Sequence, residues 1–169
     1  LFDLDPSKKM REYSKGSRQK VALVAAFSAS ADLLLLDEPT NGLDIPSKGE
    51  FRRAVARYLG EDQTLVISTH QVRDLEQLID RVVILEKGQI YCNESIADLS
   101  EKLYFGPIPS EDQAHALYSE PSIVGTVGIL PATGEPTEDT FSMELFFNAV
   151  VSQRDALLRI IHSSSNPNI

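Results

Sequence analysis

Several features that mark particular protein classes are missing from this sequence of 169 residues. It has a single cysteine, Cys92, so no internal disulfide can form and a reducing compartment is favoured. Its longest unbroken apolar run is the seven residues 21–27, far short of the roughly 20 apolar residues that a membrane-spanning helix needs. The chain has 16 basic and 25 acidic residues, which give a formal net charge of −9. This negative charge argues against a protein that binds the nucleic-acid backbone.

The chain also lacks an initiator methionine, since it begins with Leu1, and no basic segment followed by an apolar one marks a signal peptide. Its composition is that of an ordinary globular domain, with 42% hydrophobic and 24% charged residues. Its length suits about one domain. We therefore expect a globular chain and interpret it as a fragment of a longer protein.

Two short apolar runs predict strands of a layered α/β fold. Residues 33–36 and 64–67 are dominated by aliphatic side chains without alternation, which suits neighbouring parallel strands covered on both faces. Helices are expected over 47–59 and 71–78. A further helix within 14–31 carries apolar or small residues on all sides and is expected to be largely buried.

The composition changes near residue 100. Before it, residues 81–85 and 90–92 are expected to pair as a hairpin whose turn uses Gly88. After it, five of the nine prolines fall between residues 107 and 136, which favours short strands and turns. Three elements are predicted there: strands over 103–105 and 123–130, and a helix over 141–161.

Polar side chains follow both predicted parallel strands. Asp37 and Glu38 follow the first strand, and Ser68-Thr69-His70 follow the second. Ligands of open α/β sheets bind beyond the carboxyl ends of the strands, where one carboxylate suits Mg²⁺ and phosphate oxygens and a second can orient a water. His70 can hydrogen-bond a phosphate oxygen there. Taken alone, each of these features is better explained by polar residues of a turn or loop.

A basic segment precedes the predicted helix. Three cations lie between residues 15 and 20, where the helix dipole disfavours positive charge. An anion bound at this helix start would make the positive charges favourable. The exposed N–H groups, together with Ser14, Gly16 and Ser17, would then form a phosphate site. A solvated basic turn with a serine cap explains the segment at least as well.

In their order along the chain, these segments resemble the second half of the nucleotide-binding domain of ABC transporters, over residues 5–95. The matches are Tyr13-Ser14-Lys15-Gly16-Ser17 with the signature motif, residues 33–37 with Walker B, Glu38 with the general-base position, residues 41–44 with the D-loop, and His70 with the switch histidine. Lys15 replaces the first glycine of the signature motif and Ser17 its glutamine. No phosphate-cradling G-x-x-x-x-G-K-[ST] motif occurs in the sequence.

The resemblance implies a fold and a domain organisation. The fold would be α/β, the C-terminal part of a P-loop NTPase domain with a largely parallel buried sheet and a small α+β appendage. Residues 1–100 would be the second half of the ATPase domain, residues 101–162 an accessory region, and residues 163–169 a flexible tail.

The resemblance also implies site residues. Glu38 would polarise the attacking water, His70 would contact the γ-phosphate, and Asp37 would help to bind Mg²⁺. The residues that would reach the nucleotide held by a partner subunit are Ser14, Lys15, Gly16, Ser17 and Gln19. The D-loop residues that would couple two sites are Asn41, Gly42, Leu43 and Asp44.

The implied function is that of an ATP-binding subunit of an ABC transporter, which hydrolyses ATP with Mg²⁺ to drive transport. The Ser-Lys-Gly form of the signature motif favours export, and without the phosphate-cradling loop the chain alone is expected to be inactive. The expected partners are a membrane-spanning subunit and a second ABC subunit in a head-to-tail dimer, with no nucleic acid. The expected location is cytoplasmic, on the inner face of the cell membrane. Two alternatives stay open, a non-transport ABC ATPase and a non-catalytic regulatory or interaction module centred on residues 101–169.

Overall fold

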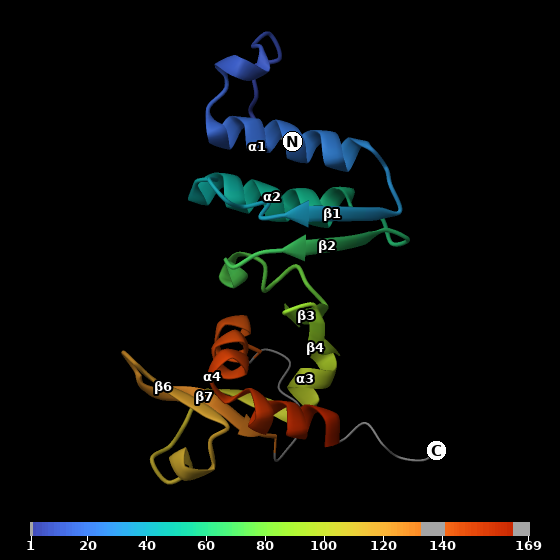
Figure 1. Cartoon of the computed structure of the whole chain (residues 1–169). Coiled ribbons are helices and arrows are strands. Elements are labelled where there is room, and N and C mark those ends of the chain that lie inside the picture. Colours follow the sequence, from blue (N-terminus) through green and yellow to red (C-terminus); the bar gives the residue numbers. More distant parts are fainter. Residues whose placement is uncertain (1, 133–140, 164–169) are drawn as a thin grey trace. The chain divides into compact units, whose positions relative to one another are not determined.

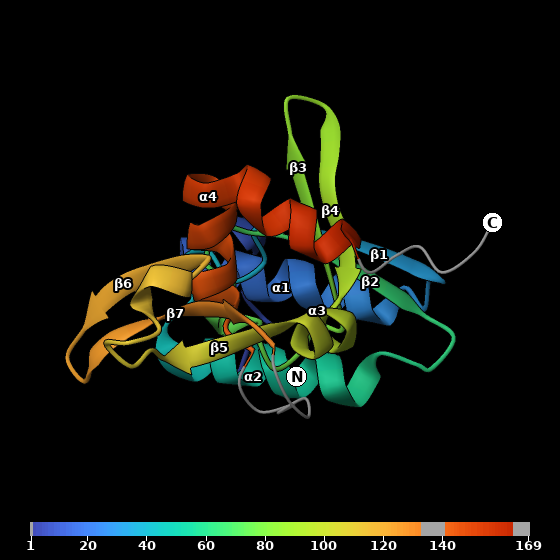
Figure 2. The same cartoon turned by 90° about the horizontal axis from the view of Figure 1, so that it is seen from below.

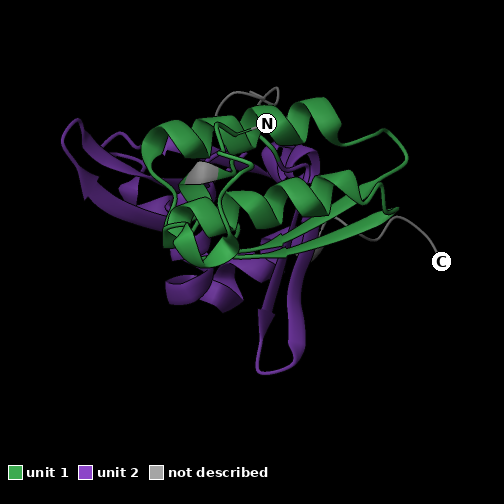
Figure 3. Ribbon diagram, turned by 90° about the horizontal axis from the view of Figure 1, so that it is seen from above, with its two compact units in different colours: residues 1–78 green, residues 79–169 purple. Residues whose placement is uncertain are grey.

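The computed structural model describes residues 2–132 and 141–163 of the chain. They fall into two compact units, Leu1–Leu78 and Ile79–Ile169 (Figure 3). The fold is α/β, as predicted. Of the predicted tail, residues 164–169 lie outside the described part. None of the described helices is both long enough and apolar enough to cross a bilayer.

The first unit contains a parallel pair of strands and two long helices (Figure 1). Its elements are a short 3-10 turn at Met10–Glu12, α1 at Lys15–Ser28, β1 at Leu33–Asp37, α2 at Ile45–Tyr58 and β2 at Thr64–Ser68. Strands β1 and β2 pair in parallel from Leu33 opposite Thr64 to Asp37 opposite Ser68. The predicted parallel pairing is therefore confirmed, and both strands end at one edge.

Side-chain caps set the starts of both helices. Ser14 accepts a hydrogen bond from the Ser17 N–H at 3.1 Å, and Asp44 accepts one from the Ser47 N–H at 2.9 Å. Each cap satisfies one of the N–H groups that a helix leaves unpaired at its start. The helices lie side by side (Figures 1 and 3), with the rings of Phe27 and Phe51 at 6.3 Å between centroids.

The expected burial of this unit is wrong in two places. Leu34 is 7% exposed, whereas its neighbours Leu33 and Leu35 are 52% and 69% exposed, so only one face of β1 is covered. Successive side chains of a strand point to opposite faces, and within the described part of this unit the helices cover one of them. In α1, only Leu23 is buried, because a single side of that helix packs against its neighbours.

The helix expected over 71–78 is also wrong. The structure has a 3-10 turn at Val72–Asp74, followed by a turn in which the Leu78 N–H donates to the Leu75 carbonyl at 2.8 Å. Bonds that span three residues are the 3-10 pattern. Starting an α-helix costs conformational entropy, and a segment this short forms too few α-helical hydrogen bonds to offset that cost.

The second unit is antiparallel (Figure 2). Its elements are β3 at Arg81–Glu86, β4 at Gln89–Ser95, α3 at Ile96–Lys102, β5 at Leu103–Pro107, a 3-10 turn at Gln113–His115, β6 at Tyr118–Ser122, β7 at Gly125–Pro131 and α4 at Met143–Ser163. Strands β3 and β4 form the predicted hairpin around Gly88, which has a φ of 76°. Strand β7 pairs with both β5 and β6, so parallel pairing among the described strands is confined to β1 and β2.

Helix α4 packs on the β5–β7–β6 sheet and closes its core. The core residues include Leu99, Phe105, Ile129, Phe146 and Leu157, each at most 1% exposed. The rings of Phe105 and Phe141 meet edge to face, with centroids 5.0 Å apart. Aromatic pairs prefer this arrangement, so the unit has a hydrophobic core of its own.

Candidate functional site

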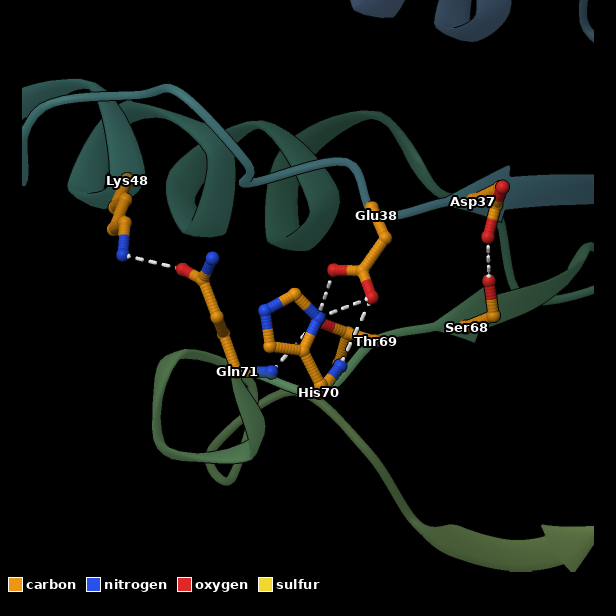
Figure 4. Close-up of polar contacts among 7 residues, drawn as sticks. All are labelled: Asp37, Glu38, Lys48, Ser68, Thr69, His70 and Gln71. Atoms are coloured by element: carbon orange, nitrogen blue, oxygen red, sulfur yellow. Dashed lines mark hydrogen bonds and ion pairs between the residues drawn. The ribbon is translucent and has the colours of Figure 1, made fainter.

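The predicted site residues that follow β1 and β2 lie together at one edge of the parallel pair (Figure 4). Asp37 is the last residue of β1 and accepts a hydrogen bond from the hydroxyl of Ser68, the last residue of β2. The Glu38 N–H donates to the Ser68 carbonyl at 2.8 Å and so continues the strand pairing by one residue. The side chains of Asp37 and Glu38 therefore lie at the same edge of the sheet as His70.

Glu38 accepts three hydrogen bonds from the segment that follows β2. Thr69 Oγ1 donates to Oε2 at 3.0 Å, while the His70 N–H and His70 Nδ1 lie 3.1 Å and 2.6 Å from Oε1 (Figure 4). These hydrogen bonds, that of the His70 ring foremost, lower the pKa of Glu38 below its ordinary value despite desolvation. Glu38 is thus an ionised carboxylate that can act only as an acceptor.

Two further contacts support the segment from Thr69 to Gln71. The Gln71 N–H donates to Thr69 Oγ1 at 3.0 Å. Lys48, on helix α2, donates through Nζ to Gln71 Oε1 at 2.8 Å. The partners of Glu38 are therefore tied to a neighbouring helix as well as to the strand.

The signature segment, residues 13–17, packs against the loop that follows β1. A Cβ atom at Gly16 would lie 2.8 Å from the Gly42 carbonyl oxygen, a distance that leaves room only for glycine. One turn further on, Gln19 Nε2 donates to the Pro39 carbonyl at 3.3 Å. Gly42 has a φ of 80°, which glycine adopts without strain. The structure thus brings the signature and D-loop segments into contact.

The remaining predicted site residues occupy ordinary local positions. Ser14 and Lys15 are exposed at the start of α1, where the Ser14 and Ser17 hydroxyls lie 2.9 Å apart. In the D-loop segment, Asn41 is exposed and Leu43 is 8% exposed. Asp44 caps α2, and its hydrogen bonds with Ser47 lower the pKa of its carboxyl group.

The sequence analysis did not assign a site role to Ser68, Thr69, Lys48 or Gln71. The two hydroxyl residues directly precede His70 in the sequence, and their position after a strand was a usable signal. Lys48 and Gln71 are 23 residues apart, and nothing in their local patterns pairs them. Only the three-dimensional structure shows that contact.

The residues at the strand ends fit a magnesium ion that is shared with phosphate. Within the described residues, no group of three or more His, Cys, Asp or Glu side chains could form an all-protein cage. Mg²⁺ is commonly held by one or two carboxylates together with phosphate oxygens and water. Asp37 offers one exposed carboxylate and suits that kind of site.

Comparisons with known proteins show partial similarity to ABC transporter proteins. Residues 3–41 match the family model of the ABC transporter. This stretch carries the signature segment, β1 and Glu38. An uncharacterized ABC transporter ATP-binding protein of Methanocaldococcus jannaschii is 36% identical over 97 residues, which are 57% of this chain and 37% of that protein. These matches support an ABC transporter ATPase domain in this chain.

Two other relatives from this ABC family are informative. The daunorubicin resistance ATP-binding protein DrrA3 of Streptomyces coeruleorubidus is 28% identical over 99% of this chain and 52% of its own length. The molybdenum import ATP-binding protein ModC of Albidiferax ferrireducens is 38% identical over 63% of this chain and 29% of its own length. The chain therefore spans between about a quarter and a half of the relatives that it matches.

Proposed function

We propose that this chain belongs to an ATP-binding subunit that binds ATP with Mg²⁺ and hydrolyses it to drive transport across a membrane. The observation that supports this most is the environment of Glu38. Its ionised carboxylate lies at the end of β1 and is held by donors from Thr69 and His70. A fixed acceptor of this kind is what positioning an attacking water requires.

Each residue at this edge has a distinct task in the proposed reaction. Glu38 accepts a hydrogen bond from the water and orients it toward the γ-phosphate. His70 fixes Glu38 through Nδ1 and presents the rest of its exposed ring to the phosphate side. Asp37 would hold the magnesium ion. When bound, this ion would neutralise negative charge on the phosphate oxygens.

The signature segment serves a second subunit in this proposal. Ser14, Lys15, Gly16, Ser17 and Gln19 would contact a nucleotide held by the partner subunit in a head-to-tail dimer, and Asn41, Gly42, Leu43 and Asp44 would couple the two sites. The direct packing of Gly16 on Gly42 supports this coupling, because a movement of one segment displaces the other.

We propose that the chain is part of a longer subunit, with the ATPase portion over residues 1–100, an accessory region over 101–162 and a tail over 163–169. Two observations support this. The sequence contains no G-x-x-x-x-G-K-[ST] motif, which cradles phosphates in this class of protein. The relatives described above extend well beyond the segments that match this chain.

We propose export as the direction of transport and a membrane-spanning subunit as the partner. The drug-resistance protein DrrA3 aligns over 99% of this chain, including the region after residue 100, whereas the importer ModC aligns over 63%. The proposed location is the cytoplasmic face of the cell membrane.

The substitution Glu38→Gln tests the proposed function. In the full-length protein that carries this chain, it is expected to lower Mg²⁺-dependent release of phosphate from ATP by about 100-fold or more, because the acceptor for the water loses its charge. ATP-driven dimerisation, measured by size-exclusion chromatography, is expected to persist. Glu61→Gln, the same change at an exposed position after α2, serves as the control. Unchanged turnover in Glu38→Gln would show that Glu38 does not act on the water.

A further inference from the structure

The hydroxyl group of Thr69 has a fixed orientation. The Gln71 N–H, 3.0 Å away, can only donate, so Thr69 Oγ1 must accept that hydrogen bond. Its own proton is then directed to the other neighbour, Oε2 of Glu38, at 3.0 Å. Thr69 therefore links a backbone amide to one particular oxygen of the Glu38 carboxylate.

The two oxygens of the Glu38 carboxylate are not equivalent. A carboxylate offers about four acceptor positions, two on each oxygen. The backbone N–H and Nδ1 of His70 occupy both positions of Oε1, at 3.1 Å and 2.6 Å. Thr69 occupies one position of Oε2. One acceptor position is left, and it lies on Oε2.

Backbone conformation and a contact from α2 hold this arrangement in place. Glu38 has a φ of 45°, a left-handed conformation that non-glycine residues adopt at an energetic cost. Its N–H bond to the Ser68 carbonyl keeps it there. On the other side, Lys48 Nζ holds the Gln71 side chain at 2.8 Å, which fixes the residue whose N–H orients Thr69.

We propose that Thr69 is a positioning residue that directs the attacking water to the remaining acceptor position on Oε2 of Glu38. This inference rests on the proposed function, since it needs Glu38 to act on a water. It goes further by naming the oxygen that receives the water and the side chain that selects it. Without the Thr69 hydroxyl, Oε2 has two open positions and the water has no single site.

Kinetics of the full-length protein test this role. Thr69→Val keeps the shape of the side chain but removes the hydroxyl, and is expected to lower kcat for ATP hydrolysis roughly tenfold with the KM for ATP unchanged. Thr69→Ser restores the hydroxyl and is expected to restore most of the rate. Thr69→Ala repeats the loss with a smaller side chain. Thr64→Val makes the same change at an exposed position of β2 and is the matched control.

A measurement without ATP separates this inference from the proposed function. The ¹³C NMR signal of the Glu38 side-chain carboxyl group, recorded at neutral pH in the full-length protein, is expected to shift in Thr69→Val and Thr69→Ala. It is expected to stay in place in Thr69→Ser and Thr64→Val. An unmoved signal in Thr69→Val, or a serine variant as slow as the valine variant, would overturn the inference. Failure of the proposed function would be seen separately, as a wild-type protein that does not hydrolyse ATP.

Discussion

Glu38 directly follows β1, and its ionised carboxylate is held by hydrogen bonds from Thr69 and His70. An amide at this position can keep its oxygen toward the His70 donors and place its nitrogen against Thr69 Oγ1, at the present position of Oε2. A hydroxyl has two acceptor lone pairs and a proton that can rotate, so Thr69 can accept from both the amide nitrogen and the Gln71 N–H. Glu38→Gln should therefore preserve the local fold, and a loss of turnover in that variant reports on the charged acceptor that the carboxylate offers to the water.

Cys92 gives a prediction at the same scale. Its side chain is 1% exposed, and burial, followed by the nearby charge of Glu94, raises the pKa of its thiol from 9.0 to about 11. The native protein is expected to react very slowly with iodoacetamide at neutral pH, while the urea-unfolded protein reacts readily. Because the unfolded chain releases the thiol proton at lower pH than the folded chain, the free energy of unfolding should fall as pH rises from 9.0 to about 11. Cys92→Ala is the control, and an equal fall in that variant would contradict the assignment to Cys92.

At the scale of the elements, helix starts are set by local caps. Ser95 ends β4 and accepts a hydrogen bond from the Asp98 N–H at 2.9 Å, which starts α3. Ser95→Ala is expected to lower the free energy of unfolding by ~1 kcal/mol, because one N–H at the helix start loses its partner. Urea denaturation checks the value, and Ser95→Asp should restore the cap. Equal stability of the alanine variant and the wild type would show that this cap contributes nothing.

How far the sequence predicted these elements depended on whether the decisive interaction was local. Asp44 and Ser47 are close in sequence, and the helix that they cap was predicted within two residues at its start. Strand β6, with the sequence Tyr-Ser-Glu-Pro-Ser, has no apolar alternation and was missed, because its pairing with β7 holds it in place. The same distinction applies to the site: the polar residues after each strand were visible in sequence, whereas the contact from Lys48 to Gln71 joins distant segments.

At the scale of the whole chain, the residues proposed to act on water and metal lie in the first unit, and the phosphate-cradling motif is missing from the sequence. In P-loop enzymes that motif supplies backbone N–H groups and a lysine that bind the β- and γ-phosphates. Glu38 and His70 are proposed to orient a water, but the sequence contains no such motif to hold the phosphate chain in line with it. Positioning accounts for most of the rate in phosphoryl transfer.

The chain of 169 residues, tested alone, is therefore expected to bind ATP weakly and to release no phosphate from it above a no-enzyme blank. Circular dichroism would first establish that the chain is folded, so that inactivity is not a consequence of unfolding. The assay would then be run with and without Mg²⁺ beside the full-length protein at equal concentration. Mg²⁺-dependent turnover by the chain alone that Glu38→Gln abolishes would contradict this expectation. It would mean that the signature segment and the strand ends suffice to hold the phosphates, and that the cradling loop contributes little.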